Sequence, residues 1–166
     1  MNNTFTIQNQ QKFELFLQIA HKLNSKHITP VLAGSLGLFR IIGDIRKAND
    51  IDGLLPDDMF VSRWQEIQQV LGSLGFMVDP DHIQEFNRGS DRISFLSYGD
   101  VQKLTSIDLS SSGNLIETTI MDTCFYELPL PIQRAIYAEG LKNKWRKARK
   151  EHEDNELIAA IDNYLS

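Results

Sequence analysis

Apolar and polar positions follow two different periods in the first third of the chain. Between residues 9 and 24, apolar side chains recur three and four positions apart, which predicts an amphipathic helix. Residues 27–32 form a short apolar run that predicts a buried strand, and Pro30 within it indicates an edge position or an irregular start. A helical pattern then resumes over 36–42 and is ended by Gly43.

The middle of the chain predicts a second strand followed by a helix. The polar segment 44–49 is typical of a loop, and residues 50–55 form an apolar run that predicts a strand. An apolar stripe over 60–74 then predicts one helix, with Asp57 or Asp58 available as its N-cap.

Short strands and a helical tail are predicted for the rest of the chain. Three short strands are expected at 76–78, 83–87 and 92–98. A polar stretch with weak helical character follows at 100–113, then a strand pair at 115–128. Two helices are expected at 132–141 and 157–165. Because helices and strands do not alternate strictly, we predict an α+β fold with a mixed sheet flanked by helices. We expect a core over 1–129 and a helical C-terminal tail over 130–166 packed on it.

Composition limits the class of protein. The chain has 166 residues with 42% hydrophobic content, which is enough for one domain with its own core. A single cysteine, Cys124, excludes an internal disulfide framework and a cysteine-based zinc cluster. No apolar run is long enough to span a membrane, and the N-terminus lacks the pattern of a secretory signal. We therefore expect a cytoplasmic protein with no membrane partner.

Asp50 and Asp52 are the first candidates for chemistry. Side chains alternate faces along a strand, so both carboxylates project from one side while Ile51 turns into the core. Two neighbouring carboxylates repel each other unless a cation lies between them, and Mg²⁺ is commonly bound by one or two carboxylates together with phosphate oxygens. The alternative interpretation is a solvated strand end.

Gly34 and Ser35 lie where the first strand gives way to a helix. Small residues at this position let a phosphate approach the backbone N–H groups of a helix N-terminus, and Ser35 adds a hydroxyl donor. The alternative is an ordinary turn with a helix cap. Each motif alone is weak, but the order Gly-Ser, helix, Asp-x-Asp is more specific.

This combination, LAGSLGLFRIIGDIRKANDIDGLLP at 32–56, resembles the nucleotidyltransferase superfamily, which contains DNA polymerase β and the aminoglycoside and lincosamide nucleotidyltransferases. More narrowly, the chain is similar to small single-domain bacterial members, some of which carry the label phosphoribosylanthranilate isomerase. That label does not suit the chain, because such an isomerase is an eightfold barrel and needs more residues than are present.

The resemblance implies a nucleotidyltransferase-like core and a site with defined roles. Gly34 and Ser35 would hold the phosphates of a nucleoside triphosphate, and Asp50 and Asp52 would coordinate Mg²⁺ or Mn²⁺ and serve as catalytic carboxylates. Arg40 and Arg46 lie between the two motifs. We expect both to contact the nucleotide. The reaction would transfer a nucleotidyl group to a hydroxyl of a small molecule, a protein or an RNA end.

Three departures from the family pattern decide between an enzyme and a binding protein. The spacer between Ser35 and Asp50 is slightly long, and Gly53 stands where the family has a hydrophobic residue. Strand alternation also places Ser94, not an acid, where the family has its third carboxylate. Glu85 on the preceding strand could take that place as a metal ligand.

Three other acids, Asp91, Asp100 and Asp108, are alternatives to Glu85. Without a third acid, metal and nucleotide binding would survive while general-base assistance weakened. The first alternative to an enzyme is therefore a catalytically degenerate nucleotide-binding or regulatory module, for example an antitoxin-like one. A further alternative is an α+β domain in which the aspartate pair is incidental.

Six basic residues at 142–150 surround Trp145 although the chain carries a net charge of -5. They could embrace a triphosphate or a nucleic-acid acceptor, with Lys142, Arg146 and Arg149 on one helix face, or they could be a solvated surface balanced by the acids that follow. His82 lies near Glu85 on a predicted hairpin, where an exposed histidine is more usual than a metal ligand. The acceptor, the preferred base and the oligomeric state, a homodimer included, stay open.

Overall fold

The computed structural model describes residues 5–44 and 46–166, so residues 1–4 and position 45 of the predicted loop lie outside it. The strands are β1 (Val31–Ala33), β2 (Ile51–Leu55), β3 (Met77–Val78), β4 (Glu85–Arg88), β5 (Asp91–Ser97), β6 (Ile116–Ile120) and β7 (Thr123–Glu127). The helices are α1 (Ile7–Asn24), α2 (Gly34–Ile42), α3 (Asp57–Ser62), α4 (Trp64–Ser73), α5 (Tyr98–Thr105), α6 (Leu130–Gly140) and α7 (Lys144–Leu165).

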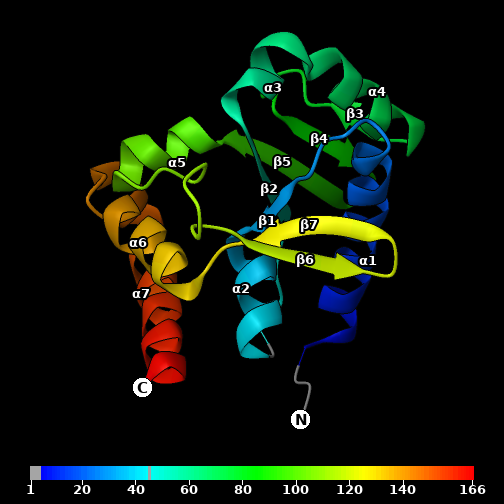
Figure 1. Cartoon of the computed structure of the whole chain (residues 1–166). Helices are drawn as coiled ribbons and strands as arrows, with labels where there is room; N and C mark the ends of the chain where they lie inside the picture. The colour runs from blue at the N-terminus through cyan, green and yellow to red at the C-terminus, as the bar shows by residue number, and fades with distance from the viewer. Residues whose placement is uncertain (1–4, 45) are drawn as a thin grey trace.

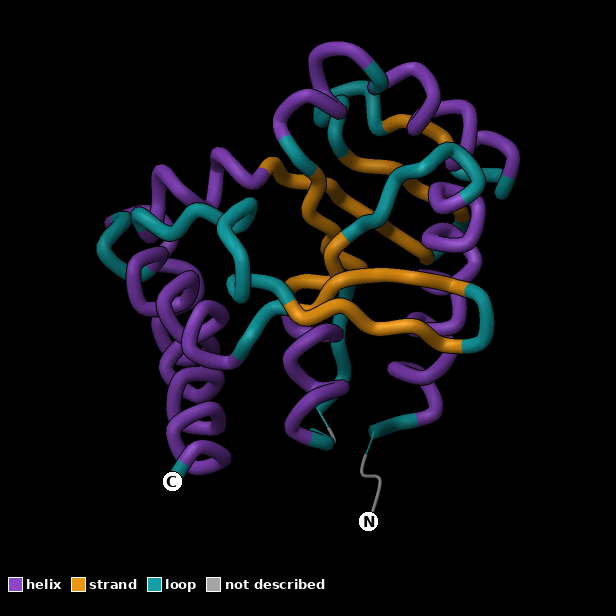
Figure 2. Tube along the Cα trace, viewed as in Figure 1, coloured by secondary structure: helices purple, strands orange, loops and turns teal. Residues whose placement is uncertain are grey.

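The strands form one seven-stranded mixed sheet in the order β3-β4-β5-β2-β1-β7-β6 (Figures 1 and 2). The pairs β2–β5 and β1–β7 are parallel, and the other pairs are antiparallel. The predicted fold class, an α+β fold with a mixed sheet flanked by helices and a helical C-terminus, is confirmed. Among the described helices, none is both long and apolar enough to cross a bilayer.

One face of the sheet carries the main hydrophobic core, beneath α1, α2 and α4. Phe16 of α1 and Phe125 of β7 are fully buried, and their rings meet edge to face with centroids 5.5 Å apart. Phe95 of β5 is fully buried on the same face and packs near Trp64. Ile51 belongs to this core, so the alternate positions of β2 point to the opposite face.

The opposite face is covered only in part, by α5, α6 and α7 (Figure 1). Leu54 and Val101 belong to a smaller apolar cluster there, together with Leu128 and Ile132. In the tail, Ile161 of α7 is fully buried and belongs to the main core. The helices α6 and α7 therefore lie along one side of this partly covered face of the sheet.

Two predicted elements differ from the observed ones. The helix predicted over 60–74 is split at Arg63, whose backbone leaves the helical region and whose guanidinium donates to the Lys26 carbonyl and to Glu66. The strand predicted over 27–32 begins only after Pro30, which confirms the irregular start. Its expected edge position is wrong, because β1 lies between β2 and β7 inside the sheet.

A buried asparagine ties α1 to the segment that leads into β2. Asn9 is fully buried, its Nδ2 donates to the Arg46 carbonyl at 2.8 Å, and its Oδ1 accepts from the Ala48 N–H at 2.9 Å. A buried amide with both ends bonded restricts the backbone that it holds. The position of Asp50, two residues further on, therefore depends on a side chain 41 positions earlier in the chain.

Gly53 shows why β2 departs from the hydrophobic pattern of the resembled family. A Cβ added at Gly53 would lie 2.8 Å from the ring of Phe95, which is itself fully buried. The ring fills the space that a side chain at position 53 would need. Glycine is therefore required by the neighbouring strand.

Replacing Gly53 by alanine should lower the free energy of unfolding by about 1–3 kcal/mol, because the buried ring has no free space to move into. Gly72 in α4 is the matched control, since a Cβ there meets nothing within 4 Å. Gly72→Ala should be neutral or stabilise by up to about 1 kcal/mol. Urea denaturation of the two variants measures the difference, and equal effects would contradict this packing argument.

Candidate functional site

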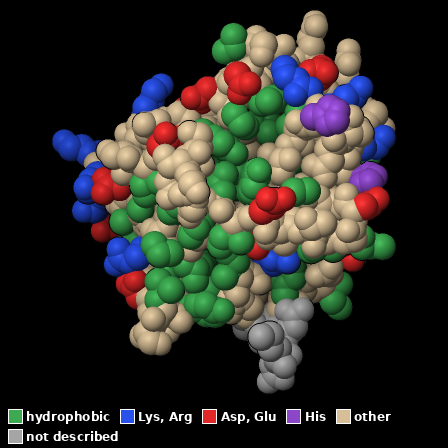
Figure 3. Space-filling view, viewed as in Figure 1, with side chains coloured by type: hydrophobic (Ala, Val, Ile, Leu, Met, Phe, Trp, Pro, Cys, Tyr) green, Lys and Arg blue, Asp and Glu red, His purple; other side chains and the backbone are tan. Residues whose placement is uncertain are grey.

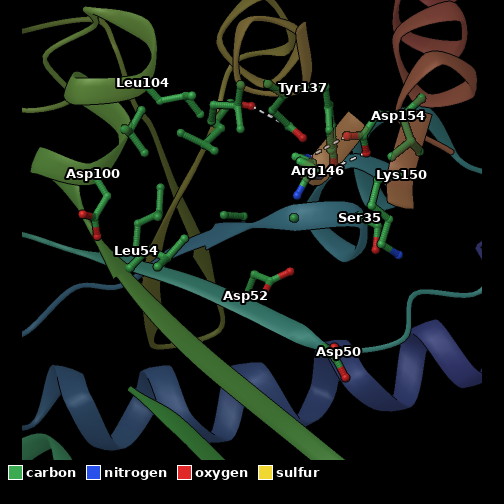
Figure 4. Close-up of a pocket in the computed structure, with 18 of the residues that line it drawn as sticks. Ser35, Asp50, Asp52, Leu54, Asp100, Leu104, Tyr137, Arg146, Lys150 and Asp154 are labelled. Atoms are coloured by element: carbon green, nitrogen blue, oxygen red, sulfur yellow. Dashed lines mark hydrogen bonds and ion pairs between the residues drawn. The ribbon is translucent and has the colours of Figure 1, made fainter. Parts of the chain in front are cut away.

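A cavity of about 580 Å³ opens between the sheet and the helices α5, α6 and α7. Its polar end is lined by Gly34, Ser35, Asn49, Asp50, Asp52, Arg146, Lys150, Glu153 and Asp154. Its other end is mainly apolar and is lined by Leu54, Leu96, Val101, Leu104, Leu128 and Ile136, with Asp100 beside them. Figure 4 shows the two ends on either side of Asp52, with Ser35, Arg146 and Lys150 on one side and Leu54 and Leu104 on the other.

The first turn of α2 packs directly against Asp52. Gly34 has a φ of +63°, and a Cβ added to it would lie 2.2 Å from Asp52 Oδ2. Both the backbone angle and the contact therefore require glycine. No side chain caps α2 at Ala33, so its first N–H groups are left for another acceptor. Such a helix start attracts an anion.

Asp50 and Asp52 both line this cavity, as strand alternation predicts, while Ile51 between them is buried in the main core. Burial raises the pKa of Asp52, and the nearby charges of Asp50 and Glu85 raise it further. A hydrogen bond from Ser94 Oγ at 2.9 Å and the charge of Arg146 act in the opposite direction. Within the described part of the chain, Asp52 has no ion-pair partner. A cation between the two carboxylates would relieve this unfavourable environment.

The position expected for a third carboxylate is occupied by Ser94. β2 and β5 pair in parallel with Asp52 opposite Ser94, and β4 continues the row with Glu85 opposite Ser94. Glu85 thus lies two strands from Asp52. Its carboxylate lies 3.8 Å from His82 Nδ1, and Asp79 lies 3.6 Å from the same nitrogen. Asp79, His82 and Glu85 form a separate cluster that could hold a metal ion, in which His82 is exposed and the two acids are half-buried.

The other candidate acids are spread over the molecule. Asp100 lines the cavity, but its carboxylate accepts from the Ser97 N–H in a capping box at the start of α5. Asp91 pairs with Arg88 at the far end of β5. Asp108 accepts hydrogen bonds from Ser110. Asp100 is thus the one among these three that reaches the cavity, at its apolar end.

Arg40 and Arg46 do not lie where the sequence predicted them. Neither lines the cavity, and each is already paired with an acid. Arg40 pairs with Glu127 and lies over the ring of Phe13 at 4.8 Å. Arg46 bonds Asp44 through two nitrogens, at 3.0 and 2.7 Å. Their place between the two motifs in the sequence did not bring them into the cavity lining.

The cations that do reach the cavity come from α7. Arg146 binds Asp154 through two bonds of 2.7 and 3.0 Å, and the carboxylate of Asp154 is almost completely buried. Lys150, one turn further along, lines the cavity and lies 2.8 Å from Glu153. Arg146 and Lys150 are four positions apart, so they lie on the same face of α7. These two residues were not grouped from the sequence.

The other basic residues of the run that have contacts lie on the outer surface of the helices. Lys142 pairs with Glu139 and Lys147 with Glu151, while Arg149 lies over the exposed ring of Trp145 at 4.2 Å. Basic and acidic side chains are interspersed along the edge formed by α6 and α7 (Figure 3). Arg146 and Lys150 therefore face the cavity, whereas Lys142, Lys147 and Arg149 belong to the outer surface of the helices.

Tyr137 of α6 was also missed. Burial and the charges of Asp52 and Asp154 raise the pKa of its phenol, so the hydroxyl stays protonated near neutral pH. Figure 4 shows Tyr137 beside Arg146, on the wall facing Asp52. The sequence did offer one indication of its position. Tyr137 follows Gln133 by four residues, so the two share a face of α6, and both are buried and line the cavity.

Comparisons with known proteins agree on the fold. No protein-family model matches the chain. A relative in Bacillus subtilis (strain 168), the uncharacterized protein YnaI, is 25% identical over 151 residues, covering 90% of this chain and 95% of its own.

Three solved structures of nucleotidyltransferase-like proteins share the architecture. ANT(2″)-Ia in complex with adenylyl-2″-tobramycin has a TM-score of 0.63 at 14% identity, over 94% of this chain and 90% of its own. The solution structure of the same antibiotic-resistance factor has a TM-score of 0.63 at 15% identity, and the match covers 95% of this chain and 86% of its own. An antigenic nucleotidyltransferase-like protein from Paracoccidioides brasiliensis has a TM-score of 0.62 at 17% identity, and the match covers 91% of this chain and 75% of its own. These likenesses show that the chain shares the fold of these proteins, and they give no support to the group labelled as an isomerase.

Proposed function

We propose that the protein binds a nucleoside triphosphate together with Mg²⁺ or Mn²⁺ in this cavity and transfers its nucleotidyl group to a hydroxyl acceptor. The observation that carries the proposal is the contact between the first turn of α2 and Asp52. It brings an uncapped helix N-terminus, which attracts phosphate, against a buried carboxylate that needs a cation. A metal–triphosphate complex supplies both charges at once.

The donor set fits a hard divalent cation. Asp50 and Asp52 offer carboxylate oxygens at the polar end of the cavity, and described histidine and cysteine residues are absent from its lining. Mg²⁺ and Mn²⁺ prefer oxygen ligands of this kind. When bound, the cation would neutralise charge on the phosphates and activate the α-phosphate toward attack. Glu85 does not line the cavity and lies beside His82 instead, so Asp50 and Asp52 are our proposed pair of ligands.

The chain's own groups would hold the triphosphate. The N–H groups of the first turn of α2 and the Ser35 hydroxyl would donate to the β- and γ-phosphates. Lys150 would reach them from α7, exchanging Glu153 for a phosphate oxygen. Arg146 would stay bound to Asp154, so its positive charge would remain beside Asp52 and would not contact the phosphates directly.

The transfer itself is an in-line exchange at the α-phosphate. An acceptor hydroxyl forms a new P–O bond while the bond to the bridging oxygen breaks, and pyrophosphate leaves with the negative charge. The hydroxyl proton must pass to a base or to water. Ser94 cannot serve as that base in the way a carboxylate would, because a neutral hydroxyl is a far weaker proton acceptor.

Ser94 also favours the second candidate, a family member that binds nucleotide but has lost most of its transfer activity. In this interpretation the protein is a nucleotide-binding or regulatory module. The first experiment below tests nucleotide binding, which both candidates share, and the second separates them.

Mg²⁺ with a nucleoside triphosphate should raise the melting temperature by roughly 5–10 °C at about 100 times the Kd. Asp52→Asn should abolish that shift, because it removes the metal ligand while keeping the shape of the side chain. The free variant should be no less stable than the wild type, since burial already disfavours the charge of Asp52. Differential scanning fluorimetry measures both quantities.

Asp58→Asn is the matched control for Asp52→Asn, because Asp58 is exposed on α3 away from the cavity. It should retain the full shift. If wild-type protein shows no shift with any of the four nucleoside triphosphates, with or without metal, the proposed function is wrong.

Ser94→Asp should increase metal-dependent release of pyrophosphate by about 10² or more, because it restores a carboxylate beside Asp52. Water can act as the acceptor in this assay, so the natural acceptor need not be known. The double variant with Asp52→Asn should lose the gain. A wild-type rate already equal to that of Ser94→Asp would contradict the degenerate interpretation and favour an active enzyme.

A further inference from the structure

The strand β6 forms one end of the sheet, and among the described residues it pairs only with β7 (Figure 1). At the other end, β3 has two residues, whereas β6 has five, with the sequence Ile-Glu-Thr-Thr-Ile. Proteins usually protect a free edge by making it short or by placing a lysine, a proline or a bulge in it. β6 contains neither lysine nor proline, and its register with β7 runs without a bulge. Its edge is therefore open to another strand.

The backbone groups on this open edge belong to Glu117 and Thr119. In β7, the N–H and the C=O of Cys124 are both bonded to the side chain of Asn24, so they point away from β6. Residues that lie opposite each other in an antiparallel pair either bond each other or both point outward. Thr119 lies opposite Cys124, and Glu117 is two positions away in the same register. Their N–H and C=O groups therefore face the free edge.

Apolar side chains lie uncovered at both ends of β6. Ile116 at its start is 46% exposed, and Met121, directly after its end, is 96% exposed. Four of the five residues of the strand are β-branched, a composition typical of strands with neighbours on both sides. Contact with a second apolar surface would remove both exposed side chains from water.

We propose that two copies of the chain associate through β6, which pairs antiparallel with β6 of the second copy about a two-fold axis at Thr118. In this arrangement Glu117 lies opposite Thr119 of the second copy, so the outward backbone groups bond each other. Ile116 lies opposite Ile120 of the second copy, and all five residues of the strand are paired. The two seven-stranded sheets become one continuous sheet.

The sequence of β6 selects a second copy as the partner and fixes this register. Moving one copy by two residues leaves three paired positions and sets either Glu117 against Glu117 or Thr119 against Thr119. Like charges directly opposite each other are destabilising. Moving one copy by a single residue brings outward backbone groups against groups that are already bonded to β7. The pairing with the greatest overlap is thus the one that keeps the glutamates apart and satisfies the backbone.

This association is independent of the proposed function, because none of the five residues of β6 lines the cavity. Analytical ultracentrifugation of the wild type tests it directly. The shared strand is short, so the association is weak and the mass should rise with concentration from 19.0 kDa toward twice that value. A wild type that stays monomeric up to its solubility limit would overturn the proposal and leave the edge to a strand from a different protein.

Two opposite charges at position 119 test the register. Thr119 is exposed, and each dimer contains two pairs of Glu117 with Thr119. Thr119→Lys should strengthen the association about fivefold, and Thr119→Glu should weaken it by a similar factor. If position 119 faced itself, both variants would weaken the dimer, and if the interface lay elsewhere, neither would change it. Either result would overturn the proposal, and the melting temperature of each variant checks that the fold is kept.

A cysteine at Thr118 tests the axis by a second measurement. Two copies of this residue would face each other with their Cα atoms about 4.5 Å apart, which is within reach of a disulfide. Thr118→Cys, in a chain with Cys124→Ser, should form a covalent dimer on oxidation and return to monomer on reduction. Ser111→Cys in the same background is the matched control, because it is exposed and lies outside β6. Cross-linking no faster at position 118 than at position 111 would contradict the proposed axis.

Discussion

The site depends on one steric constraint: the backbone of Gly34 lies directly against the carboxylate of Asp52. β1 and β2 pair antiparallel with Ala33 opposite Asp52, so the residue that follows Ala33 turns over that carboxylate as α2 begins. A left-handed glycine makes the turn, and α2 then begins beside Asp52. Every other member of the polar end is arranged around this contact.

The electrostatics follow from the same geometry. Asp52 is a buried carboxylate with Asp50 and Glu85 nearby, and the cations that offset it come from α7, more than 90 positions later. A net charge of -5 therefore says little about phosphate binding. What matters is how the charges are distributed, because Asp50, Asp52, Arg146 and Lys150 all line the same cavity.

The sequence was sufficient for the parts of the site that are local. The Gly-Ser step after the first strand and the alternation that brings Asp50 and Asp52 to one cavity follow from short-range patterns. The expectation of Ser94 beside Asp52 came instead from the family resemblance, and the pairing of β2 with β5 places the two residues opposite each other. Arg40 and Arg46 were expected at the nucleotide site, but neither lines the cavity, because proximity in sequence does not fix which space a side chain faces. Tyr137, Gln133 and the pairing of Arg146 with Asp154 depend on how α6 and α7 fold back over the sheet, which no local pattern encodes. Gly53 was noticed as a departure, but its cause, the ring of Phe95, lies on another strand.

The central claim is that a divalent cation and a triphosphate meet at Asp52. A crystal structure of the protein with Mn²⁺ and a non-hydrolysable nucleoside triphosphate, with anomalous scattering used to locate the metal, tests it most directly. The account predicts a manganese peak between Asp50 and Asp52, with the triphosphate reaching the first turn of α2. A peak confined to the separate cluster of Asp79, His82 and Glu85, with no nucleotide in the cavity, would contradict it.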